Sequence, residues 1–340
     1  PIFGTVRDRS TKEHAKRLDT DRYFRHATRP LCEPRPRVAV VGAGISGLVC
    51  ARTLLDHGID VTVFEKSRGV GGRMATRRTE EGPRFDHGAQ YFTVRDPRFE
   101  RYVQSWMRDG IVEPWEGQIC TLTNGRVEWK QETTPRFVAI PGMNAIGRHL
   151  AADLHVRLRT QVRPPEFDQG AWRLVDEQGN QLGQFDGVIL SAPAPQSAEL
   201  LAAAPHLQQQ ARTTTMRGCW ATMLSFERSL ELPFAGAFVH DSPLSWIARN
   251  DSKPQRGGDR EAWVLHGSPD WTAQNLEAHP DDVLPQLLDA FWQATGAKRR
   301  RPSYAACHRW RYAIPPEPLD DRCLFDAERC IGACGDWCSG

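Results

Sequence analysis

Residues 38–67 constrain the fold of this chain more than any other stretch. They begin with an apolar run of strand length, residues 38–41, which ends at Gly42. Apolar side chains then recur at helical spacing, and a second apolar run, residues 61–64, ends at Glu65. This pattern predicts a strand, a tight turn, a helix and a second strand with a carboxylate at its tip.

Three glycines in the predicted turn have separate physical roles. Gly42 allows the sharp turn out of the strand, Gly44 lets backbone N–H groups approach a pyrophosphate, and Gly47 lets the helix pack close to the sheet. The first helical residues, Ile45 and Ser46, contribute unpaired N–H donors and the positive end of the helix dipole. The turn therefore predicts a dinucleotide site rather than a purely structural glycine-rich turn.

An acid at the end of the second strand supports this prediction. Glu65, followed by Lys66, lies 18 residues after Gly47, at the spacing where a carboxylate accepts hydrogen bonds from ribose hydroxyls. Residues 68–74 then read RGVGGRM, and residues 85–92 read FDHGAQYF. Far away in the sequence, residues 330–336 read CIGACGD, an apolar strand followed by Gly-Asp.

The three segments resemble the glycine-rich signatures of FAD-dependent amine oxidases and related flavoproteins, which nicotinamide dehydrogenases do not usually carry. The resemblance implies FAD as the cofactor, with the final Asp bound to the ribityl chain. It also places one strand residue, Val162, beside the adenine by position alone. The residues expected at the cofactor are Gly42, Gly44, Ile45, Ser46, Gly47, Glu65, Lys66, Gly72, Arg73, Gln90, Tyr91, Val162, Gly335 and Asp336.

Length and composition narrow the remaining classes. With 340 residues the chain can form two domains, and its net charge of +2 gives no reason to expect a nucleic-acid or membrane partner. We therefore expect a cytoplasmic protein. Nine cysteines do not suggest a disulfide framework. Cys330, Cys334 and Cys338 overlap the flavin segment, so we predict no metal site.

The order of the elements predicts an α/β protein. We expect a discontinuous Rossmann-like FAD-binding domain of the GR2 type, formed by residues 37–94, 141–212 and 306–340. A second domain for substrate, an antiparallel sheet with helices, is expected from residues 95–140 and 213–305.

Local patterns predict individual elements. Apolar positions within residues 99–107 predict an amphipathic helix, and Asn124-Gly125 predicts a hairpin turn. We also expect a helix from residue 141 to about 154 and a single strand at residues 185–190.

The two ends of the sequence depart from the rest. Residues 1–36 lack apolar periodicity and close with a proline-rich run, which indicates a disordered extension. In the family a final helix follows the Gly-Asp turn and donates N–H groups to the flavin, whereas this sequence stops at Gly340. We therefore expect a chain that ends there to retain FAD weakly.

Further motifs resemble the renalase branch of the amine oxidase superfamily. They are DHGAQY at residues 86–91, IPG at 140–142, VLH at 264–266 and CHRWR at 307–311. The resemblance implies hydride transfer from the 2- and 6-dihydro isomers of NAD(P)H to flavin N5. NAD(P)+ is released, and O2 is reduced to H2O2.

An amine oxidase acting on a small amine, or another small-molecule FAD oxidase or dehydrogenase, is the alternative, and a protein that binds FAD without turnover is a second. Many amine oxidases place a Lys near flavin N5. Beyond the first seventy residues only Lys130, Lys253 and Lys298 are present, none of them in a recognisable version of that motif. Their context favours the dihydronicotinamide substrate.

Candidate catalytic residues follow from the resemblance. Tyr91 and Trp310 could stack on a flat ring, and His266, at a strand end, could hydrogen-bond a carboxamide. Arg249 and Asn250 are weaker candidates for substrate binding. Each has a structural alternative: a satisfied core histidine, a core aromatic side chain or a solvated loop charge.

Overall fold

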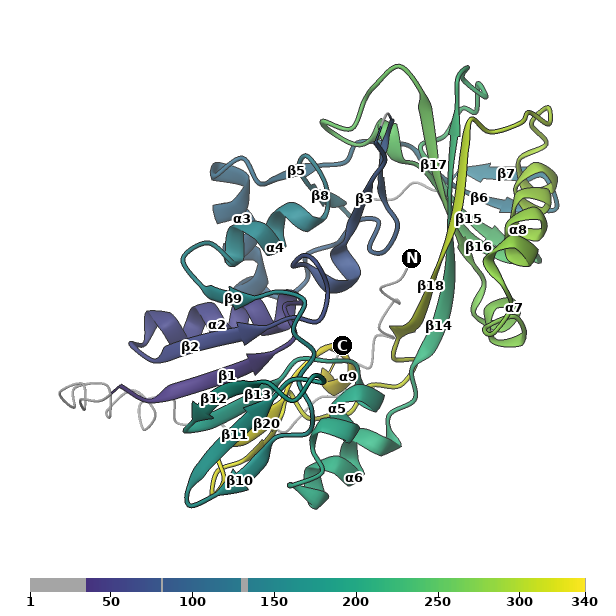
Figure 1. The fold of residues 1–340 in the computed structure, drawn as a ribbon. Helices are drawn as coiled ribbons and strands as arrows, with labels where there is room; N and C mark the ends of the chain where they lie inside the picture. The colour runs from purple at the N-terminus through teal and green to yellow at the C-terminus, as the bar shows by residue number, and fades with distance from the viewer. Residues whose placement is uncertain (1–34, 81, 130–133, 340) are drawn as a thin grey trace, which may run out of the picture.

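Two large sheets organise the molecule (Figure 1). The structure, a computed structural model, describes residues 35–80, 82–129 and 134–339. The extension predicted for residues 1–36 therefore lies almost entirely outside the described residues, as does Lys130.

The first sheet has six strands in the order β19-β20-β13-β1-β2-β9. Every neighbouring pair is parallel except β19 with β20. Its strands are β1 (Arg37–Val41), β2 (Asp60–Phe64), β9 (His155–Arg157), β13 (Gly187–Leu190), β19 (Leu324–Asp326) and β20 (Ile331–Ala333).

Both faces of this sheet are covered, which explains the uninterrupted apolar runs in its strands. On one face Val40 packs in a cluster with Leu48 of α2 (Ile45–Asp56). On the other face Ala39 packs in a cluster with residues of α5 (Ala194–Leu200) and α6 (Pro205–Thr213). β1 lies between β2 and β13, so the strands that follow β1 in the chain are added on both sides of it. The order of strands therefore reverses direction at β1. In such sheets the crevice at the carboxyl ends of these strands is the ligand site.

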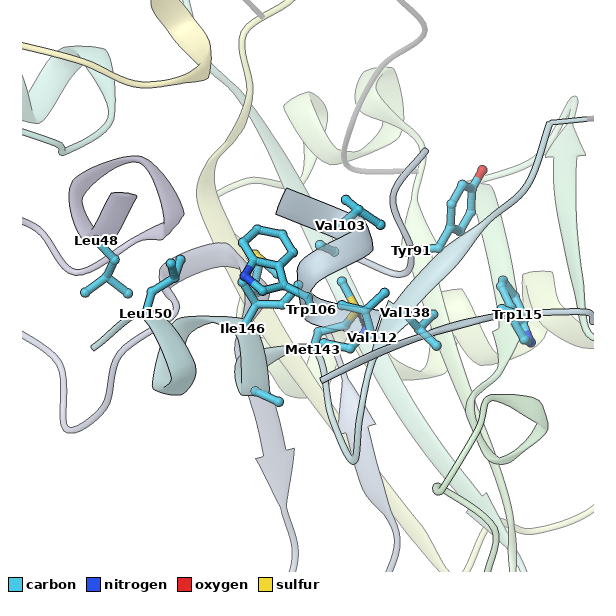
Figure 2. Close-up of a cluster of buried hydrophobic side chains, with 14 of the residues drawn as sticks. Leu48, Tyr91, Val103, Trp106, Val112, Trp115, Val138, Met143, Ile146 and Leu150 are labelled. Carbon is cyan, nitrogen blue, oxygen red and sulfur yellow. Dashed lines mark hydrogen bonds between the residues drawn. The ribbon is translucent and has the colours of Figure 1, made fainter. Parts of the chain in front are cut away.

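Smaller elements surround that crevice. They include the turn η1 (Gly72–Met74), the hairpin of β3 (Thr76–Arg78) and β4 (Arg84–Asp86), and the short pair β5 (Val112–Pro114) and β8 (Phe137–Ala139). Helices α3 (Pro97–Arg108) and α4 (Asn144–Leu150) contribute Val103, Trp106, Ile146 and Leu150 to one buried cluster, part of which Figure 2 shows. A three-stranded antiparallel sheet, β10 (Glu166–Asp168), β11 (Ala171–Val175) and β12 (Gln181–Phe185), and the final turn α9 (Asp336–Ser339) complete this part.

The second large sheet has seven strands in the order β18-β14-β17-β16-β15-β6-β7. All neighbours are antiparallel except β15 with β6. The strands are β6 (Ile119–Thr123), β7 (Arg126–Trp129), β14 (Arg217–Phe226), β15 (Gly236–His240), β16 (Leu244–Arg249), β17 (Glu261–Gly267) and β18 (Tyr304–Ile314).

Helices cover the outer face of this second sheet. α7 (Pro269–Gln274) and α8 (Pro280–Thr295) lie on the side away from the first sheet (Figure 1). Phe291 of α8 packs against Trp263 with ring centroids 5.4 Å apart. The opposite face of the second sheet is turned toward the first sheet and the β3–β4 hairpin (Figure 1).

Several local predictions are confirmed. The helix expected around residues 99–107 is α3, and the predicted hairpin turns at Asn124 and Gly125, both with positive φ. Two predicted elements differ. The single strand expected at residues 185–190 is divided between β12 and β13, because Asp186 bonds both backbone groups of Arg37 through its own N–H and its carboxylate. The helix expected from residue 141 to about 154 is shorter, Asn144–Leu150.

The strands of the two sheets can be compared with the predicted domain boundaries. β18 lies wholly in the seven-stranded sheet, so the chain returns to the first sheet after Ile314 rather than at residue 306. The division into an FAD-binding and a substrate domain stays a prediction. Among the described residues, no helix has the length and apolar character needed to cross a membrane.

Candidate functional site

The turn between β1 and α2 has no room for side chains at two of its glycines. A Cβ at Gly42, where φ is +108°, would lie 2.6 Å from the carbonyl oxygen of Ser191, and one at Gly47 would lie 2.1 Å from that of Gly42. At Gly44 nothing lies within 4 Å of a Cβ position. The first turn of α2 has neither a side-chain cap nor an acidic residue. Its N–H groups are therefore available to a diphosphate, as the sequence predicts.

Glu65 at the end of β2 is held in a fixed orientation. Its side chain is buried, with Oε2 accepting from the Ala43 N–H at 2.8 Å and Oε1 from the Ser67 N–H at 2.8 Å. An ionised carboxylate has about four acceptor positions, so two remain for ribose hydroxyls. Lys66 beside it is exposed.

Arg73 connects the cofactor segments to one another. Its guanidinium donates to both oxygens of Asp336, each at 2.6 Å, and to the carbonyl of Ala313 at 2.9 Å. Gly72, with φ +53°, precedes it, and a Cβ there would lie 3.3 Å from the Cα of Gly44. The second and third glycine segments therefore meet the first one in space, which fits FAD binding across this crevice.

Two other predicted cofactor residues are more deeply embedded. Val162 is buried and forms an isolated bridge with Asp176. Gln90 is also buried, and its amide donates to the carbonyls of Asp86 and Gly88. A direct role at the cofactor stays a prediction for both.

One carbonyl gathers two of the predicted catalytic side chains. The His87 carbonyl oxygen is 3.3 Å from Nε2 of His266 and 3.0 Å from Nε1 of Trp310. Since a carbonyl only accepts, Nε2 of His266 carries the proton and Nδ1 does not. That Nδ1 is buried without a hydrogen-bond partner among the described residues.

His87 and His308 belong to the same cluster, although sequence reasoning did not select them. His87 stacks on Trp310 at 5.1 Å, and His308 meets the edge of Trp310 at 4.4 Å. The sheet register explains the arrangement, since Ala221 pairs with His308 on one side and with His266 on the other. Residues paired in this way face the same side of a sheet, so a small side chain separates two imidazoles. The motifs DHG and CHRW contain both histidines and were the available signal.

Burial keeps these imidazoles neutral. It lowers the pKa of His266 to about 3 and, with a contribution from His308, that of His87 to about 4. The pKa of His308 is also lowered, first by burial and then by the positive charge of Arg77. His266 is almost fully enclosed, whereas His308 and Trp310 are partly exposed. His308 and Trp310 are therefore the members of this cluster that a small molecule can reach.

Tyr91 lies in a different environment. Its ring packs against both Trp115, at 5.9 Å, and Trp246, at 5.6 Å, with the Arg136 guanidinium 5.1 Å above it. Figure 2 shows Tyr91 and Trp115 at one end of the buried hydrophobic cluster. Trp246 pairs with His266 across β16 and β17, so Tyr91 borders the histidine cluster through Trp246.

The two weaker candidates have different surroundings. Asn250 is buried and donates to the Arg84 carbonyl at 2.7 Å while its oxygen accepts from Lys253. Arg249 borders a cavity of about 710 Å³ that Glu113 and Pro254 also line. Its Nε is buried and has no hydrogen-bond partner among the residues described.

A buried charge cluster lies behind the DHGAQY segment. Asp86 accepts from Nε of Arg256 at 2.7 Å and lies 3.5 Å from Nζ of Lys253, and all three side chains are fully enclosed. Lys253 also donates to the side-chain oxygens of Gln90 and Asn250, each at 3.2 Å. Its three N–H donors are thus directed to partners inside the protein. In the described ranges, no group of three or more His, Cys, Asp or Glu is placed to hold a metal ion.

Comparisons with known proteins agree with this geometry. Residues 40–106 match the family described as NAD(P)-binding Rossmann-like domain. Renalase of Mus musculus is 25% identical over 307 residues, which cover 84% of this chain and 87% of the mouse protein.

Solved structures show the same fold. Cyclohexylamine oxidase from Brevibacterium oxydans IH-35A superposes with a TM-score of 0.68 at 13% identity, over 90% of this chain and 94% of that one. Wild-type putrescine oxidase bound to putrescine gives a TM-score of 0.64 at 13% identity, over 88% and 93%. The chain is therefore similar to renalase over most of its length, and its fold is that of these two amine oxidases.

Proposed function

We propose that this protein oxidises the 2- and 6-dihydro isomers of NAD(P)H to NAD(P)+. When bound, FAD supplies the hydride acceptor at N5 and passes the electrons to O2, which gives H2O2. The observation that carries the proposal is the cluster around the His87 carbonyl. It presents an indole and an imidazole next to a small residue, Ala221, on one face of the sheet.

The reaction's proton requirements favour this substrate over an amine. A dihydropyridine becomes an aromatic pyridinium as the hydride leaves, so no proton has to be removed. An amine must lose an N–H proton before or during its oxidation, and a base or water network helps. The residue that could act through a water in such a network, Lys253, donates its hydrogens to Asp86, Gln90 and Asn250.

The neutral cluster also suits the product. A pyridinium is a flat cation, and Trp310 offers a ring for it to stack on. Because the pKa values of His266, His87 and His308 are lowered, the three imidazoles add no positive charge that would repel it. The carboxamide of the ring needs hydrogen-bonding partners, and the proposal assigns one of these to the partly exposed His308.

Amine oxidation is the second candidate, and His308 is the observation that favours it. A partly exposed neutral imidazole beside Trp310 can accept a proton from a bound amine. The chain also shares the fold of cyclohexylamine oxidase and of putrescine oxidase, with TM-scores of 0.68 and 0.64.

Anaerobic flavin bleaching separates these candidates. The FAD-loaded protein is mixed with borohydride-derived dihydro-NAD isomers and, separately, with cyclohexylamine and putrescine. Rapid bleaching by the isomers alone is the expected result. Rapid bleaching by an amine alone would overturn the proposed substrate in favour of the second candidate. If no reductant bleaches a stoichiometrically bound flavin, the protein binds FAD without turnover, and the proposal fails.

A further inference from the structure

Three arginines from separate elements come together beside the β3–β4 hairpin. Arg78 of β3 and Arg84 of β4 are directly opposite each other in the register of the antiparallel pair. Side chains at such positions lie about 5 Å apart at Cβ and face the same side, and like charges there are destabilising. An acidic residue at one of these positions would form an ion pair across the hairpin and would stabilise it more than two arginines do.

The third arginine is held beside this pair by buried contacts. α4 is fixed to the hairpin at its start, where the Met143 N–H donates to Asp86 at 2.9 Å and the Asn144 N–H to Thr76 at 3.4 Å. Thr76 and Asp86 are themselves paired across the hairpin. Arg148 lies about one helical turn beyond Asn144, as Arg78 and Arg84 lie two residues beyond the Thr76–Asp86 pair. All three arginines therefore lie within a short distance along the chain of the contacts that fix α4 to the hairpin.

The electrostatic environment of Arg148 agrees with this placement. The pKa of Arg148 is lowered by partial burial, and the positive charges of Arg78 and Arg84 lower it further. In the part of the chain that the structure describes, none of the three forms an ion pair. Glu80, in the hairpin connection, makes none with them either. By contrast, Arg98 and Arg311, which are also exposed, bind Asp96 and Glu277.

We propose that Arg78, Arg84 and Arg148 form a binding site for phosphate groups. A guanidinium presents paired N–H donors that match phosphate oxygens, and three of them together suit a ligand with two or more negative charges. The ligand is the diphosphate of a nucleotide or an inorganic polyphosphate, which share this chemistry. The site does not depend on the proposed oxidation and requires no change in the flavin.

Binding of inorganic pyrophosphate to the FAD-loaded protein tests the site by calorimetry at low ionic strength. We expect Arg148→Gln to weaken binding about tenfold, and 0.5 M salt to weaken binding to the wild type. Arg126→Gln is the matched control, because Arg126 is an exposed arginine on the distant edge strand β7. Equal affinity of the wild type and Arg148→Gln for pyrophosphate would overturn the proposal.

Thermal stability without ligand distinguishes this role from a structural one. Arg148 lies in the last turn of α4, where a cation stabilises a helix, so a purely structural role predicts a lower Tm for Arg148→Gln and a lower one still for Arg148→Glu. An anion site predicts the opposite order, because a glutamate would pair with Arg78 and Arg84. A raised Tm with lost pyrophosphate binding in Arg148→Glu supports the site, and a lowered Tm counts against it.

A second titration identifies the source of the phosphate groups. ADP that binds more tightly than pyrophosphate, with the same loss in Arg148→Gln, supports a nucleotide ligand. Pyrophosphate that binds as tightly as ADP, again with that loss, supports an inorganic one. Binding of both that is unaffected by Arg148→Gln places the ligands elsewhere and refutes the site.

Discussion

Arg73 and Asp336 form a bidentate ion pair although 263 residues separate them in the sequence. Arg73 belongs to the glycine-rich segment at residues 68–74, and Asp336 belongs to the one at residues 330–336. The same arginine bonds Ala313 in β18, and its backbone carbonyl accepts from the Ala89 N–H at 2.8 Å. One residue thus joins the cofactor segments to the DHGAQY loop, on which Trp310 packs.

Arg73→Lys tests this connection. A lysine keeps the positive charge but cannot bind both oxygens of Asp336 in parallel. We expect FAD affinity to fall by about 1–3 kcal/mol, since hydrogen bonds to charged groups contribute that much. Fluorescence titration of the apoprotein with FAD measures the change. Arg98→Lys, which alters an exposed bidentate pair on α3, is the control, and equal loss in both variants would contradict the prediction.

Glu65→Ala tests the ribose acceptor. The substitution removes the partner of two backbone N–H groups, on Ala43 and Ser67, as well as the predicted ribose contact. FAD binding should weaken by about 1–3 kcal/mol. Glu65→Gln keeps one acceptor oxygen and should lose less. An FAD dissociation constant unchanged in Glu65→Ala would remove Glu65 from the site.

Trp310→Ala separates catalysis from cofactor binding. The variant loses the stacking surface and the Nε1 bond to the His87 carbonyl but removes none of the hydrogen bonds of Glu65, Arg73 and Asp336. We expect slower anaerobic flavin reduction with FAD still bound. Trp310→Phe keeps a ring without the N–H donor, so its rate should lie between the two. Reduction at the wild-type rate in Trp310→Ala would make Trp310 a core residue only.

Lys253→Met and Arg256→Met should destabilise the fold to different extents. Arg256 is the shorter contact to Asp86, so its loss leaves a buried carboxylate poorly compensated, at a cost of about 3–5 kcal/mol. Burial already lowers the pKa of Lys253 to about 8, and Nζ lies farther from Asp86, at 3.5 Å. Arg256 still compensates Asp86 when Lys253 is lost, so the cost comes mainly from the unpaired acceptors of Gln90 and Asn250, about 1–3 kcal/mol. Urea unfolding at pH 7 measures both. A larger loss for Lys253→Met would contradict this order.

The buried histidines predict how stability depends on pH. In the folded protein the pKa of His87 is about 4 and that of His266 about 3, both below the ordinary value of 6.5. The unfolded chain therefore binds more protons as the pH falls below 6.5, and each imidazole removes up to about 1.4 kcal/mol of unfolding free energy per pH unit until its folded pKa is reached. Above pH 6.5 the imidazoles are neutral in both the folded and the unfolded chain, so they no longer reduce the unfolding free energy. Urea unfolding of the wild type and His266→Gln between pH 7 and pH 4 checks it, and a shallower slope is expected in the variant. Parallel slopes would refute the assignment to His266.

The sequence predicts the nucleotide half of this molecule well because its signals are local. Gly42, Gly47 and Glu65 act within one strand–turn–helix–strand unit, and their spacing reflects contacts that the structure confirms. The alternating strands of the second sheet were also predictable from their apolar pattern.

The histidine cluster was less predictable because it depends on long-range register. His308 joins it only because Ala221 pairs with both β17 and β18, and no sequence pattern specifies that pairing. Lys253 was set aside because its motif is unfamiliar, and only the structure reveals its burial against Asp86. Tyr91 packs against Trp115 and Trp246, contacts that its own motif does not specify, and its role at the catalytic wall stays a prediction.

The strand order of the first sheet has a consequence for synthesis on the ribosome. β1 pairs with β13, and β13 pairs with β20, so the parallel sheet cannot be completed before residue 333 has left the exit tunnel. The early strand–turn–helix unit must wait beside an open sheet edge while the seven-stranded sheet is translated. We therefore expect the FAD site to be completed late in synthesis, and the nascent chain to expose that edge to chaperones until the last strand docks.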